Sequence, residues 1–484
     1  VSSCSKIRPP KRPRLASPSV VNASPPSPPR APLSLGRKLL FSAILTAFAS
    51  GLFLVALELT LRVAGYGHSP DFARREKLPD GSVIWRENRD FTVPFFSEQL
   101  VRRPQPFRLP AEKPPGTVRI PVLGSSAAMG DPESSFSLAR LLEAQLRAAY
   151  PENNFEVVNA AITAINSHVV RRIAADCARL LQPDLFIVYE GHNEVIGPFG
   201  PTGVFTGFLR SERAVRAAVW LKSSRTGQLL TALAGRARHS SEKWGGMEMF
   251  LQHQLPAGDP RLDIVRDHFS ANLRAIVTSA ARAGASTLLC TTLANQRDFA
   301  PFLSLHRPDL ADAQRSDWEN AFATANTALL AGDNTRAEAA FRAALAIDDR
   351  YAELPFRLAR LLLSTGHPDA AAPLFQRALA PAAPRFRADS SLNNLIRDSA
   401  AASARENLPV RLVDLASPTA APARHGFPAG NQLLHEHVHL TFQGTAAIVE
   451  EIFPAVVSEL RLRHRLPPRP PGLHRDLPAR GPYG

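Results

Sequence analysis

Cysteine is scarce in this sequence, with three residues in 484, and no two of them form a Cys-x-x-Cys pair. A disulfide framework is therefore excluded, as is any metal or redox site that depends on paired cysteines. Cys177 and Cys290 each lie in an apolar stretch, which predicts that both are small buried core residues.

Acidic residues are missing from one end of the chain and rare at the other. The first 38 residues contain eight lysines and arginines and no acid, and residues 461–484 contain six arginines and one aspartate. Nearly all of the net charge of +14 lies in these tails, so the body is close to neutral and a nucleic-acid-binding groove is not expected. Both tails are also rich in proline, which predicts disorder over residues 1–38 and 464–484.

One long run carries no charge at all. Residues 39–57 are nineteen uncharged residues behind Arg37 and Lys38, which is long enough to span a bilayer. The basic flank predicts a single-pass helix over 39–64, a cytoplasmic N-terminus and an extracytoplasmic, periplasmic remainder. A cleaved signal peptide is the alternative, although the run is longer than a typical signal-peptide core.

From residue 117 onward, short apolar runs alternate with longer amphipathic stretches. The runs predict buried strands at 118–123, 155–159, 184–189, 286–292 and 409–415. The stretches between them predict helices at about 135–149, 167–182, 261–284, 390–406 and 442–462. This order is typical of an α/β fold with a three-layer α/β/α parallel sheet, although Pro121 removes a backbone donor from the first strand. Residues 65–116 show few periodic signals and are expected to form an irregular connector.

A repeat interrupts this alternation. Residues 332–346 and 366–380 align without a gap at an offset of 34 residues. The coinciding positions are Gly332/Gly366, Ala337/Ala371, Phe341/Phe375, Ala344/Ala378 and Leu345/Leu379. A period of 34 residues is typical of tetratricopeptide repeats, in which pairs of helices stack. We therefore expect an all-α insert over 316–385 that packs against the α/β domain and offers a surface to a protein partner.

The candidate chemistry lies in three short polar segments: Gly124-Ser125-Ser126, Gly191-His192-Asn193-Glu194 and Glu436-His437-Val438-His439. Each is expected at the carboxyl edge of the sheet, which is where parallel α/β folds bind ligands. A serine hydroxyl becomes a good nucleophile when a histidine takes its proton, and the tetrahedral intermediate needs donors at its oxyanion. Together the segments can supply a nucleophile, an oxyanion-binding amide and a base.

With these motifs the chain resembles the SGNH (GDSL-like) hydrolases, and more narrowly the membrane-anchored bacterial kind that carries tetratricopeptide repeats. The resemblance lies in the strings LGSSAAMGDP, VVNAAITAINSH, VYEGHNEVIGPFG, WGGMEMF, NQRDFAPFLSLH and HEHVHLTFQG. It implies that Ser126 is the nucleophile, that Asn193 is an oxyanion donor, and that His439 is the base, oriented by Glu436. It implies no metal and no organic cofactor.

The sequence departs from the family pattern at four positions. Ser125 stands where the family has an acid that orders the turn, and Glu194 and Glu436 each stand where it has an aspartate. Ala164 stands at the glycine whose backbone N–H enters the oxyanion hole. A backbone donor does not require glycine, and we expect the Ala164 amide to serve if its φ angle is negative.

Other polar residues near these segments have open interpretations. Asn295, Arg297 and Asp298 follow the strand predicted at 286–292 and either contact substrate or include a surface ion pair. Asn166 is expected to cap the helix that follows it, and Thr441 to cap the last helix.

The sequence therefore predicts a membrane-anchored, extracytoplasmic serine esterase acting on an acyl ester, with an acylated carbohydrate or lipid as candidate substrates. Transfer of the acyl group to a polysaccharide hydroxyl is one alternative, and a non-catalytic scaffold that uses the repeats beside a degenerate site is another. A zinc site is a less favoured alternative, because His435, His437 and His439 alternate without a recognisable set of other ligands. The hydrolase domain is expected in two parts, 117–315 and 386–463.

Overall fold

The computed structural model describes residues 1, 34–202, 205–236, 255–256, 258–379 and 386–467. Two units follow one another along the chain, Val1–Thr60 and Leu61–Gly484. The motif at 244–250 and most of the two tails predicted to be disordered lie outside the described residues.

The N-terminal helix α1 (Leu35–Val63) has 29 residues, a mean hydropathy of 2.3 in its most apolar window, and no buried residue. Among the described residues it alone is long and apolar enough to cross a membrane. A signal sequence shares these properties, so the helix fits either of the two alternatives raised by the sequence.

The second unit is built on a five-stranded parallel sheet, as predicted. Its strands are β4 (Thr117–Gly124), β5 (Asn154–Asn159), β6 (Leu185–Tyr189), β7 (Ser286–Cys290) and β8 (Val410–Val413), in the order β5-β4-β6-β7-β8. Pro121 fits because the β4–β6 ladder begins only at Val122. On that side of β4, the preceding Arg119 N–H donates instead to the carboxylate of Asp184 (2.8 Å). Pro121 therefore lacks its backbone N–H at a position where β4 does not yet pair with β6.

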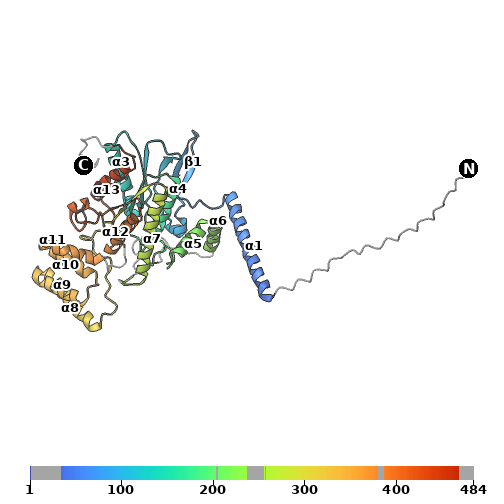
Figure 1. The fold of residues 1–484 in the computed structure, drawn as a ribbon. Helices are drawn as coiled ribbons and strands as arrows, with labels where there is room; N and C mark the ends of the chain where they lie inside the picture. Colours follow the sequence, from blue (N-terminus) through green and yellow to red (C-terminus); the bar gives the residue numbers. More distant parts are fainter. Residues whose placement is uncertain (2–33, 203–204, 237–254, 257, 380–385, 468–484) are drawn as a thin grey trace. The chain divides into compact units, whose positions relative to one another are not determined.

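Helices cover both faces of this sheet (Figure 1). One face carries α3 (Leu138–Ala149) and α13 (Phe442–Leu462), and the other carries α4 (Ser167–Leu180), α7 (Arg261–Arg282) and α12 (Ser390–Arg405). Side chains of β4 alternate between the two hydrophobic cores, with Val122 in one and Leu123 in the other. The three-layer α/β/α prediction is confirmed.

The expectation of an irregular connector before the sheet was wrong. Residues 65–116 contain an antiparallel sheet in the order β1-β2-β3, with β1 (Ala73–Lys77), β2 (Val83–Glu87) and β3 (Arg108–Pro110), and two short 3₁₀ turns. Four of the five β1 residues are charged and Ala73 alone is buried, so this strand has no alternating apolar pattern to detect. The helices α5 (Glu212–Ser223) and α6 (Arg225–Arg236) were not among the predicted elements.

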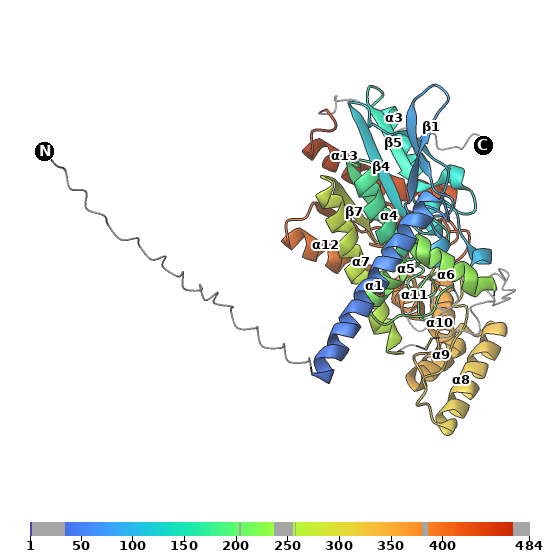
Figure 2. The same cartoon turned by 90° about the vertical axis from the view of Figure 1, so that its right-hand side faces the viewer.

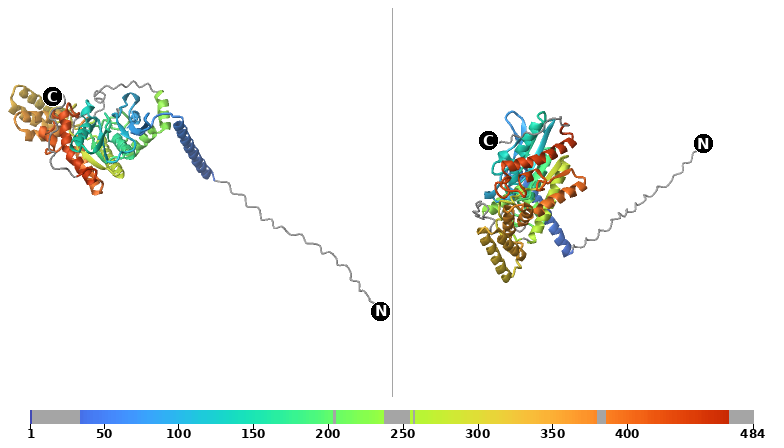
Figure 3. Two further views of the ribbon diagram at one scale, coloured as in Figure 1. Left: turned by 90° about the horizontal axis from the view of Figure 1, so that it is seen from above. Right: turned by 90° about the vertical axis from the view of Figure 1, so that its left-hand side faces the viewer.

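The predicted repeats form four helices, α8 (Asp312–Leu330), α9 (Asn334–Ile347), α10 (Glu353–Ser364) and α11 (Pro368–Leu379). Figure 2 shows these neighbouring helices packed side by side, and Figure 3 shows them as a group distinct from the sheet. Gly332 and Gly366 follow α8 and α10 with φ angles of 77° and 83°, a left-handed conformation that favours glycine. The repeated alanines and phenylalanines are buried in the core between these helices.

The two ends of the insert lie close together. The rings of Phe302 and Phe386 meet edge to face, with centroids 4.9 Å apart. The buried Arg387 donates hydrogen bonds to the backbone carbonyls of Asn295 (2.6 Å) and Phe299 (2.9 Å). The chain therefore leaves and re-enters the α/β domain at one place.

Because its ends meet, the insert is expected to be dispensable for folding of the sheet. Replacement of residues 303–385 by a short Gly/Ser linker should leave a domain that unfolds cooperatively when followed by circular dichroism, since closing a surface loop of changed length costs little entropy. Loss of the cooperative transition in this variant, with intact transition in the full chain, would contradict this expectation.

Candidate active site

Ser126 lies at the tight turn that leads from β4 into the short helix α2 (Ser126–Met129). A Cβ atom on Gly124 would lie 2.1 Å from the carbonyl oxygen of Tyr189, so the close approach of β4 to the end of β6 requires glycine. Ser126 is 7% exposed. As the first residue of α2, it has an N–H without an intrahelical acceptor, which leaves this amide available to a ligand.

Asn193 lies just beyond the end of β6, in the neighbouring loop. Its side-chain Nδ2 donates to the carbonyl of Ile165 (2.9 Å), and this bond fixes the amide while using one of its two hydrogens. Asn193 is 8% exposed, so the remaining hydrogen lies in a largely desolvated place. An amide held in this way is a suitable donor for a developing oxyanion.

Ala164, one residue before Ile165, has a φ angle of 61°. The negative φ on which its role as a donor was made conditional is therefore not found. The residue adopts the left-handed conformation that glycine takes without strain, and alanine pays about 1–2 kcal/mol for it because of its Cβ. The backbone of the loop at Ala164 therefore has the conformation that a glycine would adopt there.

His439 and Glu436 form the predicted pair. The Nδ1–H of His439 donates to Oε1 of Glu436 (2.8 Å), and the backbone N–H of His439 donates to the same oxygen (2.7 Å). The second carboxylate oxygen contacts Nδ1 of His437. Since Nδ1 of His439 carries the proton, the neutral ring presents Nε2 as an acceptor, and within the described residues this atom is buried without a hydrogen-bond partner.

Burial sets the protonation state of the His439 ring. Desolvation lowers its pKa below the ordinary 6.5, and the negative charge of Asp131 acts in the opposite direction. Asp131 is fixed beside the nucleophile turn, because its backbone N–H donates to the carbonyl of Ser126 (3.1 Å) and its carboxylate accepts from Thr163 Oγ1 (2.7 Å). His439 is therefore neutral at neutral pH.

The strand order brings these segments to one edge of the sheet. β4 and β6 are adjacent while β5 lies on the other side of β4, so the crevice between the ends of β4 and β6 is the topological switch point of a doubly wound sheet. Ser126 follows β4 and Asn193 follows β6. Phe136, after the nucleophile turn, meets Phe442, after His439, with ring centroids 5.2 Å apart. No hydrogen bond joins Ser126 Oγ to His439 Nε2 in this structure.

Two buried glutamates, which the sequence did not single out as a pair, lie beneath this edge. Glu190 follows β6 directly, and its carboxyl lies beside Ser125 and Glu194 without forming a hydrogen bond of standard geometry to either. Burial raises the pKa of both carboxyls, that of Glu194 to about 7 and that of Glu190 well above its usual range. Burial therefore favours the protonated, neutral form of Glu190, whose carboxyl lies beside Ser125.

Glu194 takes over a role expected of Asn166. It accepts from the backbone N–H of Ser167 (2.9 Å) and from its hydroxyl (2.6 Å), at the start of α4. Asn166 occupies the N-cap position, but its side chain donates to the carbonyl of Pro198 instead. The prediction that Asn166 caps this helix was wrong, because the Glu194 carboxylate from another loop is the acceptor at the helix N-terminus instead. Thr441 caps α13 as predicted, by accepting from Gly444 N–H (3.0 Å).

The alternating histidines do not converge on one point. The ring of His437 packs between three phenylalanines, with centroid distances of 5.1–6.0 Å (Phe299, Phe302 and Phe386). Burial lowers the pKa of His437 to about 2 and that of His192 to about 3. In the described part of the chain, no three His, Cys, Asp or Glu side chains are grouped so that they could hold a metal ion.

The loop after β7 is tied to the loop that carries His439. Asn295 is fully buried, donates through Nδ2 to Asn431 (2.8 Å), and its backbone N–H donates to the carbonyl of His437 (2.9 Å). Arg297 and Asp298 form an ion pair (3.1 Å). A contact of these three residues with substrate stays a prediction.

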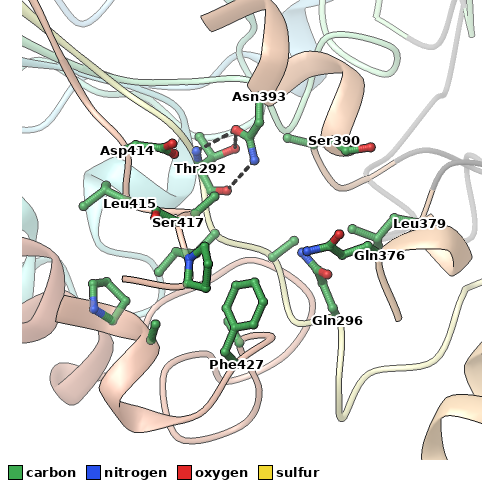
Figure 4. Close-up of a pocket in the computed structure, with 18 of the residues that line it drawn as sticks. Thr292, Gln296, Gln376, Leu379, Ser390, Asn393, Asp414, Leu415, Ser417 and Phe427 are labelled. Atoms are coloured by element: carbon green, nitrogen blue, oxygen red, sulfur yellow. Dashed lines mark hydrogen bonds between the residues drawn. The ribbon is translucent and has the colours of Figure 1, made fainter. Parts of the chain in front are cut away.

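A cavity of about 480 Å³ lies beside this loop, over the ends of β7 and β8 (Figure 4). Asn393 forms its inner wall by bonding the backbone of Thr292 in both directions (2.9 and 3.0 Å). Figure 4 shows the side chains of Gln296 and Gln376 next to each other at the side formed by the repeats. Ser126, Asn193 and His439 do not line this cavity.

Comparisons with known proteins agree with the repeats and give distant structural neighbours. Residues 328–394 match the tetratricopeptide repeat family, and no curated protein matches the chain. The chain is similar to LAE5, an α/β hydrolase enzyme from the metagenome of Lake Arreo in Spain, with 13% identity over 70% of this chain and 95% of that chain and a TM-score of 0.31. It is similar to the acetyl xylan esterase AlAXEase (12% identity, 70% and 100% covered, TM-score 0.31). It is also similar to the lipase/acylhydrolase from Enterococcus faecalis (13% identity, 70% and 96% covered, TM-score 0.29).

The left-handed alanine gives a direct test of the loop geometry. Ala164→Gly should raise the free energy of unfolding by about 1 kcal/mol, because the relief of left-handed strain exceeds the added entropy of glycine in the unfolded chain. Urea unfolding of the two proteins measures the difference. Ala161→Gly, on the same loop but without a positive φ, is the matched control and should lower stability.

Proposed function

We propose that this chain is a membrane-anchored serine esterase whose catalytic domain is extracytoplasmic. The observation that carries the proposal is the state of His439, whose Nδ1 is bonded to Glu436 while its buried Nε2 has no partner among the described residues. A neutral imidazole with one nitrogen fixed and the other free is prepared to accept a proton. Ser126, on a tight turn, and Asn193, with a fixed side-chain amide, follow the two strands that border the switch point.

In the acylation step, Ser126 Oγ attacks the carbonyl carbon of the ester while Nε2 of His439 takes the hydroxyl proton. Glu436 holds the ring in the tautomer that this transfer needs, and its negative charge stabilises the imidazolium that forms. The tetrahedral intermediate then breaks the bond to the alcohol oxygen, which receives the proton from His439. The acyl group is left on Ser126.

In the deacylation step, His439 takes a proton from water, and the resulting attack on the acyl-enzyme releases the acid and restores Ser126. In both steps the negative oxygen accepts hydrogen bonds from the backbone amide of Ser126 and from Nδ2 of Asn193. The Ala164 amide is proposed as a third donor despite its positive φ, because its left-handed backbone is the conformation that a glycine would adopt there without strain. Removal of one such donor in acyl-transfer enzymes typically lowers turnover about 10²–10³-fold.

The surroundings of the site fit a reaction between neutral groups. Burial raises the pKa of Glu190 and so favours its uncharged form, and His192 is neutral because burial lowers its pKa to about 3. The carboxylate of Glu436 is then the nearest fixed charge on His439, which favours proton transfer to that ring. The repeats, which match a family of helical repeats that stack into extended surfaces, are proposed to bind a protein partner.

Two adjacent serines allow the nucleophile to be tested with a matched control. Ser126→Ala should abolish covalent labelling by a fluorophosphonate and hydrolysis of p-nitrophenyl acetate, whereas Ser125→Ala should keep both. Mass spectrometry of the labelled protein should locate the probe on Ser126. Labelling that persists in Ser126→Ala, or that moves to another residue, would contradict the assignment of Ser126 as the nucleophile.

The dependence of activity on pH tests the base. Because His439 must be unprotonated, kcat/KM should be constant at high pH and fall as the pH drops through the His439 pKa, with a midpoint below 6.5. Asp131→Asn keeps the shape and the bond to Thr163 but removes the charge that raises this pKa. The acid limb should therefore move to lower pH in Asp131→Asn, and an unchanged midpoint would contradict the proposed base.

A further inference from the structure

The helices α5 and α6 form a hairpin with an apolar outer face. On the inner side Val215 and Val219 are buried in the core, whereas Trp220 is 73% exposed. Leu221, Leu230 and Leu233 are also at least half exposed. Leaving aside α1 and residue 1, these four account for half of the large apolar side chains that are exposed in the described residues. We call Trp220, Leu221, Leu230 and Leu233 the hairpin face.

Basic residues accompany this face. The two helices contain five lysines and arginines and one acid, Glu212. Arg213 and Arg216 are exposed on the outer side of α5, and Arg216 pairs with Glu212. Lys222 is turned inward, with its ammonium 5.8 Å from the centre of the Phe199 ring. A surface with tryptophan and leucine beside arginine is the composition of helices that lie in a bilayer interface.

The hairpin is tied to the chain just after the candidate membrane span. The backbone N–H of His68 donates to Oε1 of Gln228 on α6 (2.9 Å), and Nε2 of Gln228 donates back to the carbonyl of His68 (3.0 Å). The preceding Gly67 has a φ of 76°, and a Cβ there would lie 2.2 Å from the Gln228 amide oxygen. The connection is therefore closely fitted.

The length of the connection limits how far the hairpin can be from the end of the span. Helix α1 ends at Val63, and His68 lies five residues later. Five residues reach at most about 17 Å even when fully extended. The uncharged run ends at Leu57, six helical residues before Val63, which adds about 9 Å. His68, and with it Gln228 of α6, is therefore tethered within about 26 Å of the end of that run.

We propose that the hairpin face docks on the lipid surface at the exit of the anchor, with its arginines near anionic phospholipid headgroups. This inference depends on the proposed anchor. Docking would hold the α/β domain against the bilayer at two places, the span and the hairpin. It would also remove from water an apolar face that the described part of the chain leaves uncovered.

Site-specific fluorescence in vesicles tests the docking. The full chain carrying Cys4→Ser is reconstituted into vesicles of phosphatidylcholine and phosphatidylglycerol, and the environment-sensitive dye NBD is attached to Leu230→Cys. Leu330→Cys, an exposed leucine at the end of α8 (91%), is the matched control. A third variant, Phe48→Cys, reports on the span. Circular dichroism checks that each variant is folded.

Docking predicts a blue shift of the emission at 230 and quenching by spin-labelled phospholipid, with neither at 330 and with quenching at 48. Quenching at 48 without quenching at 230 would overturn the docking and leave the anchor intact. No quenching at 48 would remove the anchor and the docking together. A blue shift at 230 that occurs equally in detergent, without lipid quenching, would assign the face to a second copy or to residues 237–254 and would also overturn the proposal.

Discussion

The order of the strands is the constraint on which the rest of this structure depends. With β4 between β5 and β6, the chain after β4 and the chain after β6 diverge to opposite faces, and a crevice opens between them. The turn at Gly124 fits only because no side chain separates it from the carbonyl of Tyr189. The close packing of the backbone therefore fixes where the loops that carry Ser126 and Asn193 lie.

Several ionisable side chains are buried at the carboxyl edge of the sheet. A buried carboxylate without partners is unfavourable, and the structure solves this in two ways. Glu194 is given hydrogen bonds from Ser167, which in turn accepts from Asn272, whereas for Glu190 burial raises the pKa and so favours the protonated form. The negative charge that raises the pKa of His439 comes from Asp131.

The strands, the main helices and the repeats could be predicted because each has a periodic pattern. The pairing of Glu436 with His439 is predicted by the resemblance to the SGNH hydrolases, whose pattern places an acid three residues before the histidine. The sheet β1-β2-β3 could not be predicted, because its first strand is charged and covers little core. The φ of Ala164 and the place of Glu190 depend on contacts between loops that are far apart in sequence. Such contacts leave no local signal, and Glu190 differs from any other acid only in what surrounds it.

The way the repeats join the α/β domain bears on how a partner could affect the site. Arg387 closes the insert by bonding the carbonyl of Asn295, and the N–H of Asn295 bonds the carbonyl of His437, two residues before His439. This is a continuous chain of hydrogen bonds from the base of the repeats to the histidine loop. It runs through residues that belong to the α/β domain, so the repeats themselves contribute no bond to it. The repeats also reach the loop after β7 directly, because the guanidinium of Arg360 on α10 lies 3.5 Å from the carboxylate of Asp298. A partner on the repeats could therefore act on the histidine loop by moving Arg360 or the segments around 295–302 and 386–387, where the insert is anchored.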